Sequence, residues 1–312
     1  MEYDRVLVTG GAGFVGSHTV DALLESGVDT WVLDDLSSGT LRNLLERIHD
    51  PKLHIVRGDI RNFTKVRRLV GKVDAIVHLA AQVSPYVSIR HPDITNATNV
   101  DGTLNVLRAA TAEKIQKVVF ASSSSVYGEA KTRHVTEDTP PNPITPYGVS
   151  KLSGEKYCGA FYRTYGLPTV SLRYFNVYGE RQSSNPYSGV IAIFAKALAS
   201  GRRPIIFGDG YQTRDFIHVS DVARANLTAL QRNTGLGRAF NIGTGRATTI
   251  RQLFRLLSQI TDRKRIQPIF REERSGDIRN SCADMSITRS ALKYTPRIDL
   301  RPGLERLIHS LN

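Results

Sequence analysis

The sequence is poor in cysteine and tryptophan, and it has no long apolar run. It holds 2 cysteines, Cys158 and Cys282, and 1 tryptophan in 312 residues. Two isolated cysteines are too few for a disulfide framework or a thiolate metal site, so we expect inert thiols and no metal. No apolar stretch approaches the roughly eighteen residues of a membrane helix, and the run at 6–8 is too short for a signal peptide. We therefore expect a cytoplasmic protein without membrane association.

Acidic residues are also scarce relative to basic ones. The chain has 29 Asp and Glu against 42 Lys and Arg, a formal charge of +13 at pH 7. The densest basic segments, 65–69, 201–203 and 262–267, lie far apart in the sequence and lack interleaved aromatic residues. Nucleic-acid-binding proteins concentrate such charge on one face. We therefore expect no nucleic-acid partner, and attribute the charge either to attraction of an anionic small substrate or to an ordinary solvated surface.

Short apolar runs rich in β-branched residues recur along the first half of the chain, with helix-compatible stretches between them. The runs cover residues 5–9, 30–34, 53–56, 74–79, 117–122 and 169–174. This alternation predicts an α/β fold, a doubly wound parallel sheet of the Rossmann type over residues 1–175, with the strand order left open.

After residue 175 the regular alternation of strands and helices is lost. Short strands are expected at 203–208 and 238–243, followed by two amphipathic helices, one carrying Ile250 to Ile260 and one ending the chain. We interpret residues 176–312 as a smaller C-terminal α/β lobe that binds the substrate, and allow for a return of the chain into the first domain.

A glycine-rich segment follows the first expected strand directly and opens a helix. Gly10, Gly13 and Gly16 let the backbone approach a pyrophosphate, whose charge would meet the helix N-terminus. The second strand ends at Asp34, where a carboxylate can bind ribose hydroxyls and repel the 2'-phosphate of NADP, and Asp35 strengthens that preference. The pattern favours NAD. The alternative is that Asp34 only caps the turn that follows it.

The segment TPYGVSKL at 145–152 predicts a helix start with a phenol and an ammonium on one face. Thr145 can cap the helix, Pro146 suits its first position, and Gly166 can end it. Tyr147 and Lys151 are four residues apart, and a neighbouring cation should lower the pKa of the phenol. Such a pair also arises by chance on helices, so the spacing alone does not establish catalysis.

Several further motifs occur in a consistent order, and together they carry a resemblance. They are TGGAGFVGSH at 9–18, HLAAQVS at 78–84, NVDGT at 99–103, SSSSVYG at 122–128, YGVSK at 147–151, RYFNVYG at 173–179, RDFIHVSD at 214–221 and RSGD at 274–277. Over nearly its whole length the chain resembles the extended short-chain dehydrogenase/reductase family, which comprises NAD-dependent sugar-nucleotide epimerases and dehydratases.

The resemblance implies roles for individual residues. It makes Tyr147 the catalytic base, Lys151 the ligand of the nicotinamide ribose, and Ser123 the partner of the reacting hydroxyl, with Ser122 and Ser124 as alternatives. It implies NAD contacts at Gly10, Gly13, Phe14, Val15, Gly16, Asp34, Asp35, Ser38, Gly39, Asp59, Ile60, Leu79, Ala80, Ala81, Gln82, Asn99, Tyr147, Lys151 and Tyr174. It implies substrate contacts at Ser84, Ser123, Tyr147, Asn176, Val190, Arg214, Arg274, Asp277 and Ser281.

The resemblance also narrows the reaction. Dehydratases of the family carry an Asp-Glu pair after the catalytic hydroxyl residue, whereas this chain has Ser124 and Ser125, which favours 4-epimerisation of a UDP-hexose. The small Ser281 should admit an N-acetyl group on the sugar. Arg181 is the one candidate cation for a uronate, which ranks UDP-glucuronate lower. Family members usually form homodimers through the helix of the Tyr-Lys pair and a neighbouring helix, here within 98–112.

Besides 4-epimerisation of UDP-glucuronate, three other functions remain open on the sequence. One is a dehydratase, and one is a reductase with net turnover of NADPH. The third is a dinucleotide-binding regulator without enzymatic activity, although such proteins typically lack the Tyr or the Lys that are both present here.

Overall fold

The computed structural model of the chain describes residues 3–130, 132, 134–183, 189–273 and 278–311. Its largest element is a parallel sheet of seven strands with the order β10-β6-β5-β4-β1-β2-β3. The strands are β1 (Arg5–Thr9), β2 (Asp29–Asp34), β3 (Leu53–Arg57), β4 (Ala75–His78), β5 (Lys117–Ser123), β6 (Thr169–Tyr174) and β10 (Ala239–Ile242). The first six coincide with the apolar runs of the sequence, so the predicted doubly wound sheet is confirmed.

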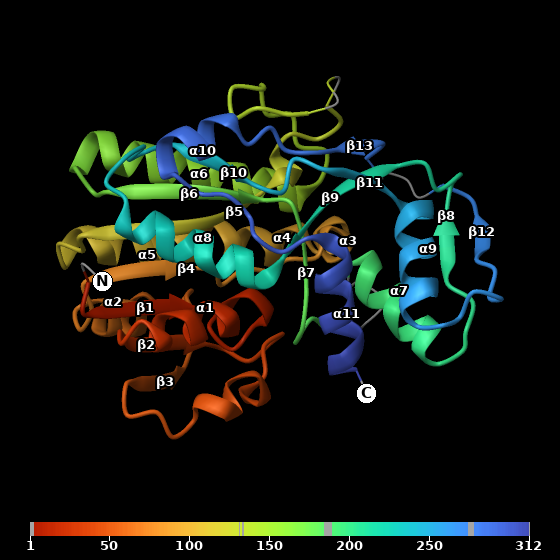
Figure 1. Cartoon of the computed structure of the whole chain (residues 1–312). Helices are drawn as coiled ribbons and strands as arrows, with labels where there is room; N and C mark the ends of the chain where they lie inside the picture. Colours follow the sequence, from red (N-terminus) through yellow and green to blue (C-terminus); the bar gives the residue numbers. More distant parts are fainter. Residues whose placement is uncertain (1–2, 131, 133, 184–188, 274–277, 312) are drawn as a thin grey trace.

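Apolar residues on both faces of this sheet explain why the strands read as continuous hydrophobic runs. In β1, Val6 and Val8 pack with α1 (Phe14–Glu25) and α8 (Val219–Gln231) on one face. Leu7 faces the opposite side, where α2 (Phe63–Val70), α5 (Gly102–Ala112) and α6 (Pro146–Tyr165) cover the sheet. Figure 1 shows the two helical layers flanking the strands.

The C-terminal lobe has two small sheets and its own apolar core. One sheet joins β7 (Asn176–Tyr178), β9 (Thr213–His218), β11 (Ala247–Thr249) and β13 (Asn280–Ser281), and the other pairs β8 (Ile205–Phe207) with β12 (Ile269–Arg271). The core lies among α7 (Val190–Ala199), α9 (Ile250–Ile260) and α11 (Leu300–Ser310). Both amphipathic helices expected near the C-terminus are therefore present.

One expected strand lies outside the smaller lobe. The strand expected at 238–243 is β10, which pairs in parallel with β6 at the edge of the main sheet, so the chain returns there into the first domain, as we allowed for. The helix before it, α8, packs against α1. Four apolar residues in a row do not reveal which sheet they extend, because that depends on contacts distant in sequence.

Short elements connect the main ones near the carboxyl ends of the strands. They are η1 (Leu41–Arg47), α3 (Pro85–Arg90), α4 (Pro92–Asn96), a π-turn η2 (Ala97–Asp101), η3 (Ser124–Val126) and α10 (Ser286–Leu292). Among the described residues, no helix combines the length and apolarity needed to cross a membrane.

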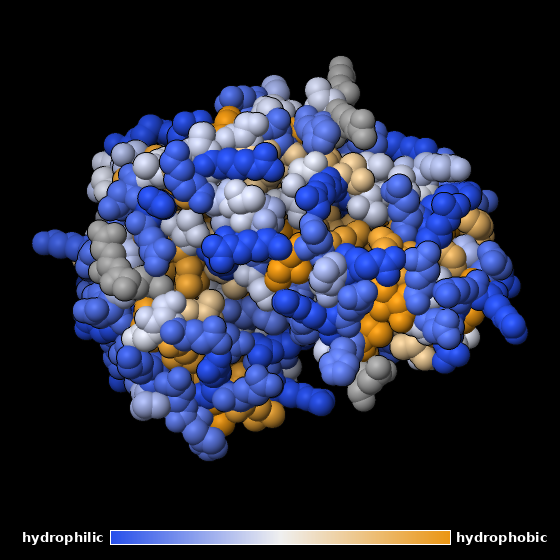
Figure 2. All heavy atoms as spheres, in the orientation of Figure 1, coloured by the Kyte–Doolittle hydropathy of each residue, from blue (hydrophilic) through white to orange (hydrophobic). Residues whose placement is uncertain are grey.

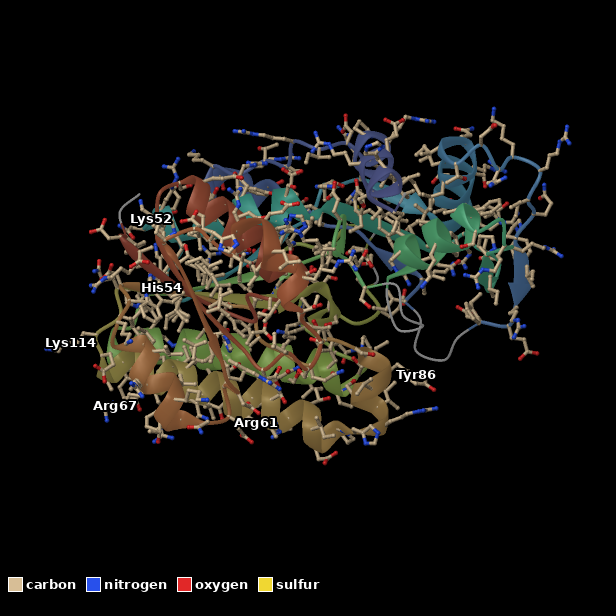
Figure 3. All side chains as sticks on the ribbon, turned by 90° about the horizontal axis from the view of Figure 1, so that it is seen from below. Lys52, His54, Arg61, Arg67, Tyr86 and Lys114 are labelled. Atoms are coloured by element: carbon tan, nitrogen blue, oxygen red, sulfur yellow. The ribbon has the colours of Figure 1, made fainter. Side chains whose placement is uncertain are left out.

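The positive charge is spread over the surface. Figure 3 shows Lys52, Arg61, Arg67 and Lys114 pointing outward from separate places on the underside, and Figure 2 shows polar side chains scattered over another face. Two of these cations form ion pairs. Arg61 contacts Asp59 at 2.6 Å, and Arg67 contacts Glu113, the residue that ends α5, at 2.8 Å.

Candidate active site

The glycine-rich segment lies between the carboxyl end of β1 and the start of α1, where the strand order reverses between β1 and β4. Gly10 has a φ of +71°, and a Cβ added there would lie 2.8 Å from the amide nitrogen of Ala80. A Cβ on Gly16 would lie 2.0 Å from the carbonyl oxygen of Gly10. No side chain caps the N-terminus of α1 at Gly13. The cradle therefore has the shape and open N–H groups that a pyrophosphate needs.

Asp34 is buried at the end of β2 and binds the backbone of this cradle. Its carboxylate accepts hydrogen bonds from the amides of Ala12 at 2.9 Å and Leu36 at 2.8 Å. Burial raises the pKa of Asp34. The capping role weighed from the sequence is thus real, and since each oxygen uses one lone pair for these bonds, both keep a second for a ribose hydroxyl. Asp35 is exposed and binds Ser37.

The other residues expected at the cofactor lie around the same edge of the sheet. Gly39 packs against the Ala12 backbone, and Ser38 beside it is exposed. The carboxylate of Asp59 binds Arg61, which lowers its pKa, and Ile60 is buried beneath α5. Phe14 and Val15 form the first turn of α1, and Leu79, Ala80 and Ala81 follow β4, all of them partly buried.

The three expected catalytic side chains meet at the carboxyl end of β5. Thr145 caps α6 by accepting a hydrogen bond from the amide of Gly148 at 3.1 Å, and Gly166 ends the helix with a φ of 69°. Ser123, the last residue of β5, hydrogen-bonds the phenol of Tyr147. The ammonium of Lys151 lies 6.0 Å from the centre of the Tyr147 ring. The sequence thus placed these groups on the correct elements.

The pKa of the phenol differs from the expectation. Burial raises the pKa of Tyr147 to about 12, and the hydrogen bond from Ser123 opposes that rise. Lys151 is 3% exposed, donates to the carbonyl oxygen of Ala121 at 2.8 Å, and has a pKa lowered by burial to about 8. The expected lowering by the lysine is therefore wrong, because burial dominates the pKa of the phenol and the ammonium, 6.0 Å from the ring centre, donates to Ala121 instead.

Asn99 supports the site through the backbone of a neighbouring loop. It lies in the π-turn η2, a helix irregularity common at functional sites, and is 2% exposed. Its Oδ1 accepts from the amide of Gln82 at 2.7 Å, and its Nδ2 donates to the Gln82 carbonyl and to the hydroxyl of Ser150, both at 2.9 Å. The side-chain oxygen and nitrogen of Asn99, which we expected to contact NAD, therefore hold the backbone of Gln82.

Tyr174 is also engaged within the protein. Its hydroxyl donates to Asn226 of α8 at 2.5 Å, and Asn226 in turn binds Thr19 of α1 at 3.0 Å. Burial raises the pKa of Tyr174 above its ordinary value. These bonds join β6 to both helices on one face of the sheet, so the hydroxyl of Tyr174 is used structurally.

Besides Ser123 and Tyr147, the described residues expected to bind the substrate come from five elements. Asn176 lies on β7 and Arg214 on β9, and Ser281 of β13 pairs with Arg214 across the small sheet. Val190 begins α7, and Ser84 caps α3 by accepting from the amide of Val87 at 3.2 Å. Two more expected contacts, Arg274 and Asp277, lie outside the described residues.

Arg181 makes ion pairs with the first domain. Its guanidinium contacts Asp21 of α1 at 2.7 Å and Glu46 at 3.5 Å. This residue was the candidate cation for a uronate, and its charge is matched by two carboxylates.

Several polar residues around the site were missed in the sequence. Ser88 accepts from the amide of Tyr147, Ser150 donates to its carbonyl, and His78 is buried between Thr9 and Thr103. The available signal was a polar residue inside an apolar motif, as at His78 in the strand 74–79. Among the described residues, no group of three His, Cys, Asp or Glu side chains is arranged to hold a metal.

Comparison with known proteins agrees with this geometry. A family model described as the NAD dependent epimerase/dehydratase family matches residues 6–243, and the chain belongs to that family. A putative UDP-glucose 4-epimerase of Methanocaldococcus jannaschii is 41% identical over 306 residues, covering 97% of each chain.

Two solved structures are similar over nearly the whole chain. The UDP-glucose 4-epimerase of Thermotoga maritima with UDP-glucose has a TM-score of 0.93 at 39% identity, covering 98% of each chain. A UDP-N-acetylglucosamine 4-epimerase from Methanobrevibacter ruminantium, in complex with UDP-N-acetylmuramic acid, has a TM-score of 0.94 at 36% identity, covering 100% of this chain and 99% of the other.

Proposed function

We propose that this protein is an isomerase that interconverts UDP-hexoses at carbon 4, with NAD as its cofactor. The observation that carries the proposal is the meeting of Ser123, Tyr147 and Lys151 at the edge of the sheet that also holds the glycine cradle. Bound NAD supplies a hydride acceptor that returns the hydride within the same turnover, so no external reductant is consumed. The cradle and Asp34 would hold its pyrophosphate and adenosine ribose.

The protein's own groups move the proton. In its deprotonated form Tyr147 would accept the proton of the sugar 4-hydroxyl as carbon 4 is oxidised to a ketone, and Ser123 would hydrogen-bond the same sugar oxygen. After the keto sugar turns over, Tyr147 would return the proton when carbon 4 is reduced from its other face. Lys151 would bind the nicotinamide ribose and supply positive charge to the buried site.

The absence of a carboxylate after Ser123 favours epimerisation over dehydration. Ser124 and Ser125 occupy the next two positions, and the hydroxyl of Ser125 is buried with no hydrogen-bond partner in the described structure. Elimination of water needs a group that protonates the departing hydroxyl, and an alcohol is a poor acid for that task. The ion pairs of Arg181 with Asp21 and Glu46 likewise argue against a uronate substrate.

The sugar range depends on Ser281. This small residue lies beside Arg214 in the register of β13 and β9, the strand pair proposed to hold the nucleotide. A small side chain there is compatible with an N-acetyl group on carbon 2 of the sugar. We therefore infer that UDP-N-acetylglucosamine and UDP-N-acetylgalactosamine are substrates alongside UDP-glucose and UDP-galactose.

We also infer a cytoplasmic homodimer that uses α6. Large apolar residues are exposed on α3 (Tyr86, Ile89), α4 (Ile94) and α6 (Val149), at fractions of 44 to 59%. These three helices contact one another, and Figure 3 shows Tyr86 projecting outward. Along α5, within the segment 98–112 expected to join the interface, the exposed residues are Arg108 and Ala112. The exposed apolar residues therefore favour α3 and α4, rather than α5, as the helices that join α6 in the dimer interface.

Chromatographic resolution of products tests the function. The purified protein would be incubated separately with UDP-glucose, UDP-N-acetylglucosamine and UDP-glucuronate, while absorbance of reduced nicotinamide is followed. We expect 4-epimers of the first two and no net change in absorbance. A clear preference for the uronate, a dehydrated product, or steady accumulation of reduced cofactor would contradict the proposal.

A further inference from the structure

Ser88 binds the catalytic tyrosine from a neighbouring helix. It lies on α3, is 0% exposed, and its hydroxyl accepts from the amide of Tyr147 at 3.1 Å while donating to the carbonyl oxygen of Pro85 at 2.6 Å. The first amides of a helix have no partner within that helix. The cap of α6, Thr145, satisfies Gly148 instead. The amide of Tyr147 therefore depends on α3.

The carbonyl group of the same tyrosine is held from the other side. The Ser150 hydroxyl donates to the oxygen of Tyr147 at 2.8 Å and accepts from the Nδ2 of Asn99 at 2.9 Å. Asn99 binds both the amide and the carbonyl of Gln82. Both backbone polar groups of Tyr147 are thus connected to one segment, residues 82–88, which also contains Ser84.

We propose that Ser88 is a positioning residue for Tyr147, and that its hydroxyl and the Asn99–Ser150 pair together join the segment 82–88 to the backbone of Tyr147 as one unit that places the catalytic phenol. The inference rests on the proposed function, because it assigns the unit to the placement of the phenol against the sugar. All the bonds connect buried or partly buried groups. A displacement of about 1 Å at a reacting group costs about a hundredfold in rate.

The pH profile distinguishes positioning from general support of the fold. The hydrogen bond from Ser123 lowers the pKa of the Tyr147 phenol. If Ser88 holds the ring in reach of Ser123, its removal raises that pKa and moves the acidic limb of kcat to higher pH. The other titratable groups facing this site are Lys151 on α6, Tyr174 on β6 and His78 on β4, and Ser88 contacts none of them in the bonds described.

The test compares Ser88→Ala with wild type, using UDP-glucose and NAD. We expect kcat to fall about tenfold or more with KM nearly unchanged, the acidic limb of kcat to shift upward, and the Tyr147 amide to exchange with deuterium at least about tenfold faster. Ser290→Ala is the matched control, because Ser290 donates to the carbonyl three residues earlier on α10 as Ser88 does on α3. That control should behave as wild type.

Two further variants keep the outcome decisive. If Ser88→Ala does not fold, Ser88→Cys and Ser150→Ala are judged by the same readouts, since a thiol is a weaker acceptor of similar size. Unchanged kcat, or a lower kcat without a shifted limb, overturns the positioning role. If the wild type converts no UDP-hexose, the proposed function fails, but deuterium exchange still tests whether Ser88 holds the Tyr147 amide. Faster exchange of that amide in Ser88→Ala supports the hydrogen bond, and equal exchange overturns it.

Discussion

At the scale of single residues, the site combines groups whose burial disfavours their charged forms. The pKa of Tyr147 is raised to about 12 and that of Lys151 is lowered to about 8, in both cases mainly by desolvation. The sequence could indicate that the two side chains share a helix face, because helical spacing fixes that. It could not give the sign of the tyrosine shift, which depends on what encloses the ring in the folded chain.

Tyr147→Phe should abolish epimerisation while leaving the fold intact. The variant keeps the ring and loses the hydroxyl, and a proton-transfer group of this kind contributes about 10²- to 10⁴-fold to rate. We expect at least that loss in kcat, with NAD binding preserved when measured by calorimetry. Tyr157→Phe, on the exposed side of the same helix, is the control and should keep its activity. Activity of Tyr147→Phe near the wild-type rate would remove the phenol from the mechanism.

Ser281→Tyr should narrow the sugar range. A phenol ring beside Arg214 would occupy the space that we assign to the N-acetyl group, and a steric clash is an effective means of discrimination. We expect kcat/KM for UDP-N-acetylglucosamine to fall about a hundredfold while the value for UDP-glucose changes little. Both values come from coupled or chromatographic rate assays on one preparation, so UDP-glucose is the internal control. Equal losses of kcat/KM on both sugars would show that Ser281 does not discriminate between substituents on carbon 2.

At the scale of elements, local signals placed the strands and helices, and hydrogen bonds between elements completed the site. The ends of α6 follow the capping rules: Thr145 caps its start, Pro146 is its first residue, and Gly166 ends it. The partner of the Tyr147 amide could not be anticipated, because Ser88 is 59 positions away and only the packing of α3 on α6 brings it near. Glycine spacing likewise predicted the cradle, while its contact with Ala80, which follows β4, depends on the strand order.

The hydrogen bonds of His78 and its burial together determine which ring nitrogen carries a proton. The amide of Ala80 donates to the Thr9 hydroxyl at 3.2 Å, and that hydroxyl lies 2.6 Å from Nδ1 of His78. The Thr103 hydroxyl donates to the Asn99 carbonyl at 2.6 Å, so Nε2–H of His78 donates to Thr103 at 3.0 Å. Burial lowers the pKa of His78 to about 3, so the ring is neutral at ordinary pH and its Nδ1 accepts from the Thr9 hydroxyl.

His78→Gln should make the free energy of unfolding depend less on pH in the acidic range. The folded pKa of about 3 lies below the ordinary histidine pKa of 6.5, so the unfolded chain binds a proton first and stability falls as pH drops from 6.5 toward 3. The slope is at most about 1.4 kcal/mol per pH unit for one group. Urea unfolding at several pH values should show a smaller slope in His78→Gln, with lower stability at neutral pH. His309→Gln, at an exposed position, is the control, and an unchanged slope in His78→Gln would contradict the assignment.

At the scale of the whole molecule, the sequence predicted the first domain better than the second. Six continuous apolar strands gave the doubly wound sheet because burial on both faces leaves a strong pattern. The sequence allowed for a return of the chain but could not place it at β10, since Ala239–Ile242 extends a sheet whose nearest strand in space, β6, lies more than sixty positions earlier. Arg181 shows the same limit, because its partners Asp21 and Glu46 belong to the first domain.

The association of two chains is the remaining property at this scale. If the exposed apolar residues of α3, α4 and α6 form a dimer interface, placing charges there should separate the protomers, because burying an unpaired carboxylate is strongly unfavourable. The double variant Ile89→Glu with Val149→Glu targets two side chains that are 59% and 51% exposed. We expect light scattering to give a dimer for wild type and a monomer for this variant. Leu45→Glu changes a 57% exposed residue of η1 and should remain dimeric. A monomeric wild type, or a double variant that stays dimeric, would exclude this surface as the interface.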